Sequence, residues 1–594
     1  MIKKTAMILA GALAAAVSAP AVPAAAETQS IRQALLKDTG FQSAFATAVD
    51  GVGQGTLGTN LAVGYWVYDQ NNSSYCLSPS DYYTSGTSTV YYASGEKRLA
   101  IDPAGKSVYL YMDSSYDYSA PRTEVQPIVA ASLRQSIKND IPVSKISELM
   151  LTTDFFIAEY QNLNTAGYNE NIHTAQLQIS LTVKNGNPES AGYGDYYLFV
   201  LPLFDARYGS APAYDNGACD SVGKKYIRNL AANEFLSSAV TPNVSYSVNL
   251  DITERIYEVF AEAKAKNYLQ NSNWSDMCIG EFSIIQSMPG SYKTGCYFSN
   301  LGLTYSVDTQ NAYLDDDYSE GFNVYTTEEG NGTINGILSA DDTPSVPEWT
   351  LAQWNSVNDL TDGYRIIQDD LYLWGDDSKQ VFIRRGSNTL GLLMNASAEY
   401  EADRVANQPW PCLLLNQEFD FQHHLKVDTL AALFMNVDFR ITKMENHMRG
   451  PVNPALHAAQ LLWYITVQNR NTESEDFGKY IWFGLQLYDS RYTFPGFYAD
   501  EDGGKDVNTG MFIYLPASSE FLEKQVIPGS FVSVEYNVLS QIKAAFQLAQ
   551  SRGYLTNTAF EDLYIGGMNI GWELPGTFDI CVEIDDLNLY PIYE

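Results

Sequence analysis

Three residue types that could act together in catalysis occur twice in the chain, in the same order and at the same spacing. The two sets are His173, Asp205 and Arg207, and His457, Asp489 and Arg491. A carboxylate beside an imidazole fixes the tautomer of the ring and raises its basicity. A nearby arginine keeps the carboxylate ionised and can bind an anionic or hydroxylated ligand. Each set is therefore a candidate for proton-transfer chemistry.

Two strands are expected to position the first set, because apolar and polar residues alternate in 173–183 and again in 196–208. The turn-rich segment NGNPESAGYG separates them, which predicts a long antiparallel hairpin. With the hairpin centred near residue 190, His173 faces Arg207 and Ala175 faces Asp205, so these side chains share one face. That face is otherwise apolar. A polar cluster that locks the hairpin register is therefore favoured over a catalytic site, with catalysis as the alternative.

The opposite face of the second hairpin combines aromatic rings with amides and hydroxyls. Its candidate ligand-binding residues are Gln460, Tyr464, Thr466, Tyr480, Trp482, Gln486 and Tyr488. Aromatic rings can cover the apolar C–H faces of a sugar while the polar groups bond its hydroxyls. The same face of the first hairpin is less aromatic and less polar, so the second hairpin is the predicted glycan-binding surface. Coverage of this face by other parts of the chain is the alternative.

Acidic loops offer weak candidates for calcium. The segment DEDGGKD (500–506) aligns with YDNGACD (214–220), and Asp502 and Asp506 could supply oxygen ligands. LDDDYSEG (314–321) is a similar segment. The spacing is not that of an EF-hand, so a turn is favoured. No cofactor is expected, with calcium as the alternative.

The doubling of the motifs indicates an internal duplication. Residues 173–208 and 457–492 align without a gap and are identical at 18 of 36 positions. We interpret the chain as two homologous copies, 61–308 and 366–594. Residues 309–365, rich in Asp, Glu, Gly, Thr and Pro, are the expected linker. Residues 27–60 are expected to be a leader segment.

The start of the chain and its charge predict an exported protein. Residues 1–26 combine a basic beginning, an apolar stretch and a small-residue cleavage site, as in a secretory signal peptide. The secreted product would be extracellular or periplasmic. Seventy acidic against 36 basic residues give a formal charge of −34, which repels nucleic acid and anionic membranes. Among six cysteines, Cys278 and Cys296 flank a predicted hairpin turn and are the most plausible disulfide pair.

The expected fold class is all-β, with two tandem antiparallel β-sandwich domains of jelly-roll type. Each copy carries many short strands and one helical segment, at 250–269 and 538–555. The tandem arrangement and the aromatic-amide faces resemble concanavalin-A-like and other jelly-roll carbohydrate-recognition domains of exported bacterial proteins. The resemblance covers both copies at the level of architecture and implies no catalytic residues.

Three functions follow from these observations. The first is polysaccharide binding through the aromatic face. The second is a glycoside hydrolase or polysaccharide lyase that uses the His, Asp and Arg residues. The third is a surface or adhesion module with a protein partner. The motifs of common zinc proteases, α/β-hydrolases and nucleotide-binding enzymes are missing from the sequence.

Overall fold

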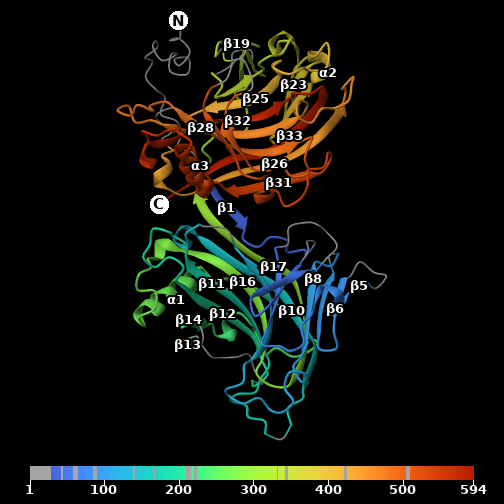
Figure 1. Cartoon of the computed structure of the whole chain (residues 1–594), viewed down its shortest axis with the longest axis vertical. Coiled ribbons are helices and arrows are strands. Elements are labelled where there is room, and N and C mark those ends of the chain that lie inside the picture. Colours follow the sequence, from blue (N-terminus) through green and yellow to red (C-terminus); the bar gives the residue numbers. More distant parts are fainter. Residues whose placement is uncertain are drawn as a thin grey trace. The chain divides into compact units, whose positions relative to one another are not determined.

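The computed structural model describes residues 29–594 except 42–44, 58–64, 85–89, 103, 138–140, 166, 209–215, 220–223, 329, 331, 341–345, 420–424 and 504–508. Strands dominate the described residues, which confirms the expected all-β class. The chain divides into two compact units, Gln29–Asp308 and Thr309–Glu594 (Figure 1). The expected signal peptide, 1–26, lies outside the described residues. No helix within them is long and apolar enough to cross a membrane.

In its described residues, the first unit has two sheets of mainly antiparallel strands. The eight-stranded sheet contains, in spatial order, β15 (Ser245–Asp251), β10 (Glu148–Asn162), β17 (Tyr292–Thr309), β8 (Ser107–Asp113), β7 (Lys97–Asp102), β6 (Val90–Ala93) and β5 (Tyr82–Thr84), with β1 (Gln29–Ala34) paired to β17. The nine-stranded sheet contains β13 (Asn216–Cys219), β14 (Tyr226–Asn229), β12 (Tyr196–Asp205), β11 (Gln176–Asn185), β16 (Met277–Met288), β9 (Val129–Ser136), β4 (Val67–Asn71), β2 (Phe45–Val49) and β3 (Val52–Leu57).

The second unit also has two sheets within the part of the chain that is described. Its nine-stranded sheet contains β19 (Ile334–Leu338), β18 (Phe322–Tyr325), β20 (Trp349–Ala352), β25 (Cys412–Glu418), β32 (Leu563–Glu573), β27 (Gln460–Asn469), β28 (Tyr480–Asp489), β30 (Phe512–Leu515) and β29 (Tyr498–Glu501). Its seven-stranded sheet contains β21 (Tyr364–Ile367), β22 (Leu371–Gly375), β23 (Lys379–Arg384), β24 (Thr389–Asn395), β33 (Phe578–Tyr593), β26 (Leu430–Asn446) and β31 (Phe531–Asn537). The long strands β26, β33 and β31 run side by side in Figure 1.

The order of the strands is the same in the two units. Across the nine-stranded sheets, β13-β14-β12-β11-β16-β9-β4-β2-β3 matches β29-β30-β28-β27-β32-β25-β20-β18-β19 position by position. The rare parallel pairs also match, since β2–β4 and β12–β14 correspond to β18–β20 and β28–β30. Apart from β1, the other two sheets agree in the same way, from β15 to β5 and from β31 to β21.

This agreement corrects the expected leader and linker. The leader at 27–60 contributes β1, β2 and β3 to the sheets of the first unit. The linker at 309–365 contributes β18, β19 and β20 to a sheet of the second unit. These segments are rich in Gly, Ala and acidic residues, so apolar and polar residues alternate little in their short strands. Backbone hydrogen bonds to neighbouring strands decide their structure instead.

A buried tryptophan anchors the start of each unit in the same way. The indole nitrogen of Trp66 donates to the backbone oxygen of Asp38 at 3.0 Å, and that of Trp349 donates to the backbone oxygen of Asp315 at 2.8 Å. Both aspartates have a positive φ, 48° and 52°. The acidic segment 314–321, a candidate for calcium, is therefore the turn that receives Trp349. The first unit builds the same turn from the less acidic KDTGF.

One apolar core lies between the two sheets of the second unit. Trp463 and Phe483 from the nine-stranded sheet are buried in one cluster with Phe439 and Ile584 from the seven-stranded sheet. Because side chains alternate along a strand, the remaining residues of β27 and β28 lie on the other side of the sheet. We call that side the outer face.

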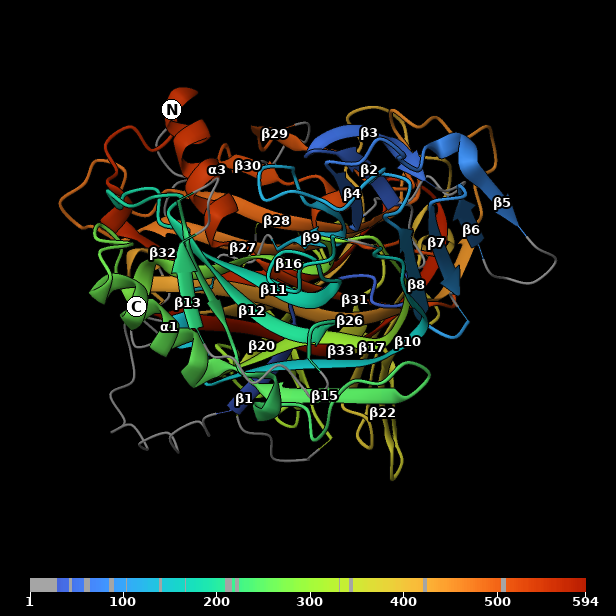
Figure 2. The same cartoon turned by 90° about the horizontal axis from the view of Figure 1, so that it is seen from below.

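The expected helices are present as α1 (Thr253–Ala265) and α3 (Leu539–Ser551). The second unit also has a single turn, α2 (Ala396–Glu399). Helix α1 lies against the nine-stranded sheet (Figure 2), where Tyr197 of β12 donates its hydroxyl proton to the backbone oxygen of Ile256 at 2.8 Å.

The predicted disulfide is wrong. Cys278 and Cys296 are both buried, and no disulfide joins them. The turn between them leads from β16 into β17, and these strands belong to different sheets. The two sulfur atoms therefore lie on strands that diverge after the turn.

Candidate functional site

A β-bulge changes which residues pair across the strands at the end of the first hairpin. In its middle, Ile179 faces Leu201, as the sequence predicts. Beyond the bulge, Asp205 faces Gln176 instead of Ala175. One extra residue on a strand turns the side chains that follow toward the other face. Asp205 therefore lies on the same face as Gln176, and the predicted apolar surroundings are wrong.

The second hairpin has the same bulge. Trp463 faces Leu485 in the regular part, whereas Gln460 faces Asp489 beyond the irregularity between Leu461 and Leu462. Asp489 consequently lies on the outer face, with the amide side chains.

Hydrogen bonds from neighbouring residues satisfy Asp205. Thr174 Oγ1 donates to Oδ1 at 2.7 Å and Gln176 Nε2 donates to Oδ2 at 2.8 Å. The backbone nitrogen and Nε of Arg207 both donate to Oδ1, at 3.1 and 2.9 Å. Burial acts to raise the pKa of Asp205, but the bonds from Arg207, Thr174 and Gln176 outweigh it and lower that pKa below its usual value.

Asp489 is held in a similar way, with an amide in place of the threonine hydroxyl. Arg491 donates from Nε to Oδ1 at 2.9 Å and from its second terminal nitrogen to Oδ2 at 2.6 Å. Gln460 and Gln486 also donate to Oδ2, at 3.1 and 2.9 Å. The bond to Asp489 raises the pKa of Arg491. Each side chain is thus committed to a partner within the hairpin.

The Asp489–Arg491 pair lines a small surface hollow. Its volume is about 260 Å³, and residues 488–493 and 525–528 line it. Because Arg491 already bonds to Asp489 and to the backbone oxygen of Pro454 at 3.2 Å, its charge is neutralised where it meets the hollow.

His173 has backbone partners on both ring nitrogens. The backbone nitrogen of Asn169 donates to Nδ1 at 2.9 Å, and Nε2 lies 2.7 Å from the backbone oxygen of Arg122. A carbonyl can only accept, so Nε2 carries the proton and the ring is neutral. The ring is 1% exposed. The expected contact between His173 and Asp205 is not formed among the described residues.

His457 repeats this arrangement. The backbone nitrogen of Asn453 donates to Nδ1 at 3.1 Å, and Nε2 lies 2.9 Å from the backbone oxygen of Arg404. Its ring is buried. Neither histidine has a nitrogen available to accept a proton from a substrate, so the His, Asp and Arg residues do not assemble into the expected set.

Two buried arginines contact the histidines, and neither was predicted from the sequence. Arg122 donates to the backbone oxygens of Pro289, Gln126 and Ile172 at 2.7, 2.8 and 3.0 Å. Arg404 makes the equivalent bonds to the backbone oxygens of Pro575, Gln408 and Leu456 at 2.9, 2.7 and 2.7 Å. We call Arg122 with His173, and Arg404 with His457, the arginine–histidine locks. Identity of both arginines in the aligned segments 116–127 and 398–409 was a signal that could have revealed them.

The outer face of the second unit carries a cluster of three aromatic rings. Tyr464 and Trp482 lie 5.7 Å apart, centre to centre, and Tyr480 and Trp482 lie 5.1 Å apart, both pairs edge to face. All three are half-buried. Trp482 donates from its indole nitrogen to Thr509 Oγ1 at 3.3 Å. The structure therefore brings these three predicted residues together on one surface.

A glycine makes room for this aromatic cluster. Tyr464 faces Gly484, and a Cβ atom on Gly484 would lie only 2.4 Å from the Tyr464 ring. In the first unit the corresponding residues are Ser180 and Val200, which also face each other. The ring of Tyr464 can thus lie over its neighbouring strand only in the second unit.

The other predicted ligand-binding residues divide between two sides. Thr466 faces Trp482 and is half-buried on the outer face. Tyr488 faces Leu461 because of the bulge, packs against the core, and lies 6.5 Å from the Trp572 ring. The prediction that Tyr488 joins the aromatic surface is therefore wrong.

Glu573 was missed as a member of this surface. It faces Gln460 on the neighbouring strand and accepts a hydrogen bond from the indole nitrogen of Trp410 at 2.8 Å. Burial raises the pKa of Tyr464, and the charges of Glu573 and Asp502 raise it further. The Tyr464 hydroxyl therefore keeps its proton at neutral pH.

The weak calcium candidates do not form a described site. Asp502 accepts from the backbone nitrogen and hydroxyl of Thr509, at 3.0 and 2.5 Å, which is turn geometry. Asp506 and the equivalent Asp220 lie outside the described residues.

Comparisons with known proteins give structural likenesses only. No family model and no curated protein matches the sequence. An endoglucanase from Rhodothermus marinus is 10% identical, covers 41% of this chain and 99% of its own, with a TM-score of 0.23. A family 11 xylanase from Neocallimastix patriciarum is 11% identical, with 38% and 94% covered and a TM-score of 0.22. The xyloglucanase domain of a type three effector from Sinorhizobium fredii, in complex with cellobiose, is 12% identical, with 39% and 97% covered and a TM-score of 0.21. Values this low transfer no activity or residue role to this chain.

Proposed function

We propose that this is an exported polysaccharide-binding protein whose second unit carries the glycan-binding surface. The observation that carries the proposal is the cluster of Tyr464, Tyr480 and Trp482 on the outer face of the nine-stranded sheet. A half-buried cluster of rings beside amides and a hydroxyl matches the amphipathic character of a sugar ring.

The polar groups beside the rings supply the hydrogen bonds. Tyr464 can donate from its protonated hydroxyl, because burial raises its pKa, and Glu573 can accept from a sugar hydroxyl. Thr466 can do either. Gln460 and Gln486 hold Asp489 in place, so they support the surface instead of offering their amides to a ligand.

The two units are proposed to be homologous jelly-roll β-sandwiches. The identical strand order and the 18 identities in 36 aligned positions support one duplicated ancestor. The shared core between the sheets of the second unit supports a two-layer packing. Export, to the periplasm or outside the cell, is supported by the signal-like start of the sequence.

Catalysis through the His, Asp and Arg residues is not part of the proposal. The neutral, buried His457 ring uses both nitrogens for backbone bonds, and Asp489 and Arg491 neutralise each other. A general base needs a nitrogen or oxygen within reach of the substrate proton.

Affinity electrophoresis on gels that contain neutral and acidic polysaccharides tests the proposal. Wild-type protein should be retarded on at least one of them, and Trp482→Ala should weaken the interaction by about tenfold, since one stacked ring contributes about 1 kcal/mol or more. Gly484→Val should weaken it similarly by displacing Tyr464. Leu198→Ala, at the matching position of the first unit, is the control and should bind as wild type.

Two outcomes contradict the proposal. One is a folded wild-type protein that moves freely on every polysaccharide. The other is equal loss of binding in Leu198→Ala and Trp482→Ala. In the first case, retention of wild type but not Trp482→Ala on a column of immobilised protein partners would favour the adhesion function.

A further inference from the structure

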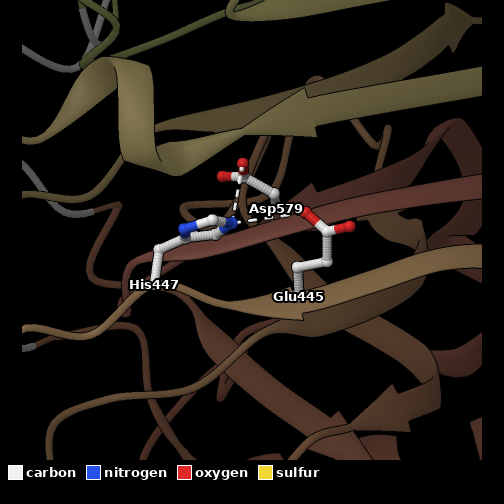
Figure 3. Close-up of side chains that lie close together, drawn as sticks. All are labelled: Glu445, His447 and Asp579. Carbon is white, nitrogen blue, oxygen red and sulfur yellow. Dashed lines mark hydrogen bonds and ion pairs between the residues drawn. The ribbon is translucent and has the colours of Figure 1, made fainter.

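Three side chains with metal-ligating atoms meet at the end of two paired strands in the second unit. Glu445, near the end of β26, faces Asp579 of β33 directly. His447 follows Glu445 by two residues, so both side chains leave the chain on the same side. Figure 3 shows the imidazole of His447 pointing at the two carboxylates. Their ligand atoms all lie within 4.8 Å of one another.

The distances fit a tetrahedral metal ion. His447 Nε2 lies 3.2 Å from Asp579 Oδ2 and 3.3 Å from Glu445 Oε2. Two ligands on a tetrahedral zinc ion with bonds of about 2.0–2.1 Å are separated by about 3.3 Å. The third pair, the two carboxylates, can close around an ion by side-chain rotation, because Glu445 and His447 are 57% and 43% exposed.

A single proton on His447 cannot satisfy both carboxylates of this cluster. His447 Nε2 carries at most one hydrogen and cannot bond fully to two carboxylate oxygens at once. A divalent ion would accept a lone pair from all three side chains. An imidazole in the donor set favours transition metals over calcium and magnesium, which prefer oxygen ligands.

Hydrogen bonds from Ser397 already orient the buried Asp579. The backbone nitrogen of Ser397 donates to Asp579 Oδ1 at 3.0 Å, and its hydroxyl donates to Oδ2 at 2.9 Å. Asp579 is 8% exposed. Hydrogen bonds of this kind fix a metal-ligating carboxylate and support affinity.

A lysine competes for the same site. Lys443 Nζ lies 3.5 Å from Glu445 Oε2 and 3.7 Å from Asp579 Oδ2, and donates to Asn395 Oδ1 at 2.9 Å. Its charge can balance the carboxylates in the absence of metal. It should therefore lower the affinity for a divalent cation and move toward Asn395 when one binds.

We propose that Glu445, His447 and Asp579 bind one divalent transition-metal ion of the zinc class, with a fourth position open to water. The first unit does not repeat this set, since the equivalent residues are Gln161, Leu163 and Lys293. The metal stoichiometry should accordingly be one per chain.

Calorimetric titration of the full chain with zinc chloride tests this inference. The double variant His423→Ala/His424→Ala serves as background, because these adjacent histidines lie outside the described residues and could bind zinc independently. This variant should bind one zinc ion per chain. Adding His447→Ala should abolish the heat, Glu445→Gln should weaken binding at least tenfold, and Lys443→Met should strengthen it by about tenfold.

Either of two results overturns the inference. One is the absence of zinc binding in the background variant, in which case the cluster is an ion-pair network around Lys443. The other is zinc binding that is unchanged by His447→Ala. Since His447 and Glu445 are exposed, these substitutions should leave the circular dichroism spectrum and melting temperature unchanged in metal-free buffer.

Discussion

The two units keep the same internal bonds and differ on their outer faces. The arginine–histidine locks share three arginine-to-carbonyl bonds and both histidine-ring bonds, from Arg122 with His173 to Arg404 with His457. Each lock joins two loops to the turn before the last long strand. These arginines and histidines bond to backbone groups of several loops. Their presence in both units therefore indicates that the fold requires them.

The outer faces have diverged at matched positions. Ser180, Leu198 and Val200 in the first unit correspond to Tyr464, Trp482 and Gly484 in the second. Here one unit gains rings and a glycine that accommodates them, while the strands beneath stay in register. Residues identical in both units therefore point to folding, and residues that differ on a shared scaffold point to function.

The largest effect should come from breaking one lock at a time. Arg404→Ala leaves three backbone carbonyl oxygens, the buried one of Pro575 among them, without their donor and should lower the free energy of unfolding of the second unit by about 3–5 kcal/mol. Arg122→Ala should do the same to the first unit. Tryptophan fluorescence during urea unfolding can separate the two, because seven of the nine tryptophans lie in the second unit.

The expectation that each lock stabilises only its own unit would be contradicted if Arg122→Ala shifted the fluorescence transition as far as Arg404→Ala does. Arg404→Lys is the conservative control and should recover only part of the loss, since an ammonium cannot reach three carbonyls in the planar geometry of a guanidinium.

A smaller, pH-dependent effect is expected at Asp205. Its pKa is lowered in the folded state, so its stabilising contribution is present above the unfolded value of 3.8 and is lost as the pH falls through the lower folded value. Asp205→Asn should destabilise the first unit by about 2–3 kcal/mol at pH 7. Hydrogen exchange of peptides from β11 and β12 measures this loss.

The difference in the free energy of unfolding between Asp205→Asn and wild type should stay constant from pH 7 to pH 5 and become smaller below pH 4. A difference that grows in acid would show that the carboxylate is not stabilised as described. Thr174→Val, which removes a single bond to Asp205, should give the same trend with a smaller amplitude.

The smallest effect should appear at the equivalent turns of Asp38 and Asp315. Burial, and a hydrogen bond shared with Asp317, raise the pKa of Asp315 to about 7. The folded state then binds this proton more tightly, so the second unit should lose stability as the pH rises from about 4 to about 7. Asp315→Asn should remove that dependence and raise the melting temperature at pH 8 by about 2–4 °C.

Asp38→Asn is the matched control for the first unit, where Thr39 and Gly40 replace the neighbouring acids. The pH profile of its melting temperature is the baseline against which the response of Asp315→Asn is compared. An equal response of the two variants would place the origin of the pH dependence outside the Asp315–Asp317 pair.

Periodicity predicted the regular parts of the fold. Alternation in 173–183 and 196–208 gave the β11–β12 hairpin, and helical spacing in 250–269 gave α1. The aromatic cluster was also predicted, because Tyr464, Tyr480 and Trp482 occupy the even positions of two regular strands. These features depend on local patterns, which a sequence displays directly.

The predictions were wrong where contacts with backbone groups far away in the sequence decide the structure. Nothing in LFDARY marks the extra residue that turns Asp205 to the other face, and the partners of Arg122 include a carbonyl 167 residues away. The strands of 27–60 and 309–365 show little alternation, and short strands near the end of a sheet gain most of their order from the strands they pair with. The cluster of Glu445, His447 and Asp579 likewise depends on pairing between β26 and β33.

The bulge near Asp489 also has a consequence for how the hairpin forms. A hairpin that closed one residue out of register would direct this carboxylate toward the apolar core, away from Gln460 and Gln486. Such a misaligned intermediate is penalised by an unpaired buried charge and should reopen before neighbouring strands add to it. Asp489 should thus favour the correct register during folding, so that Tyr464 and Trp482 come into contact only in the correctly aligned hairpin.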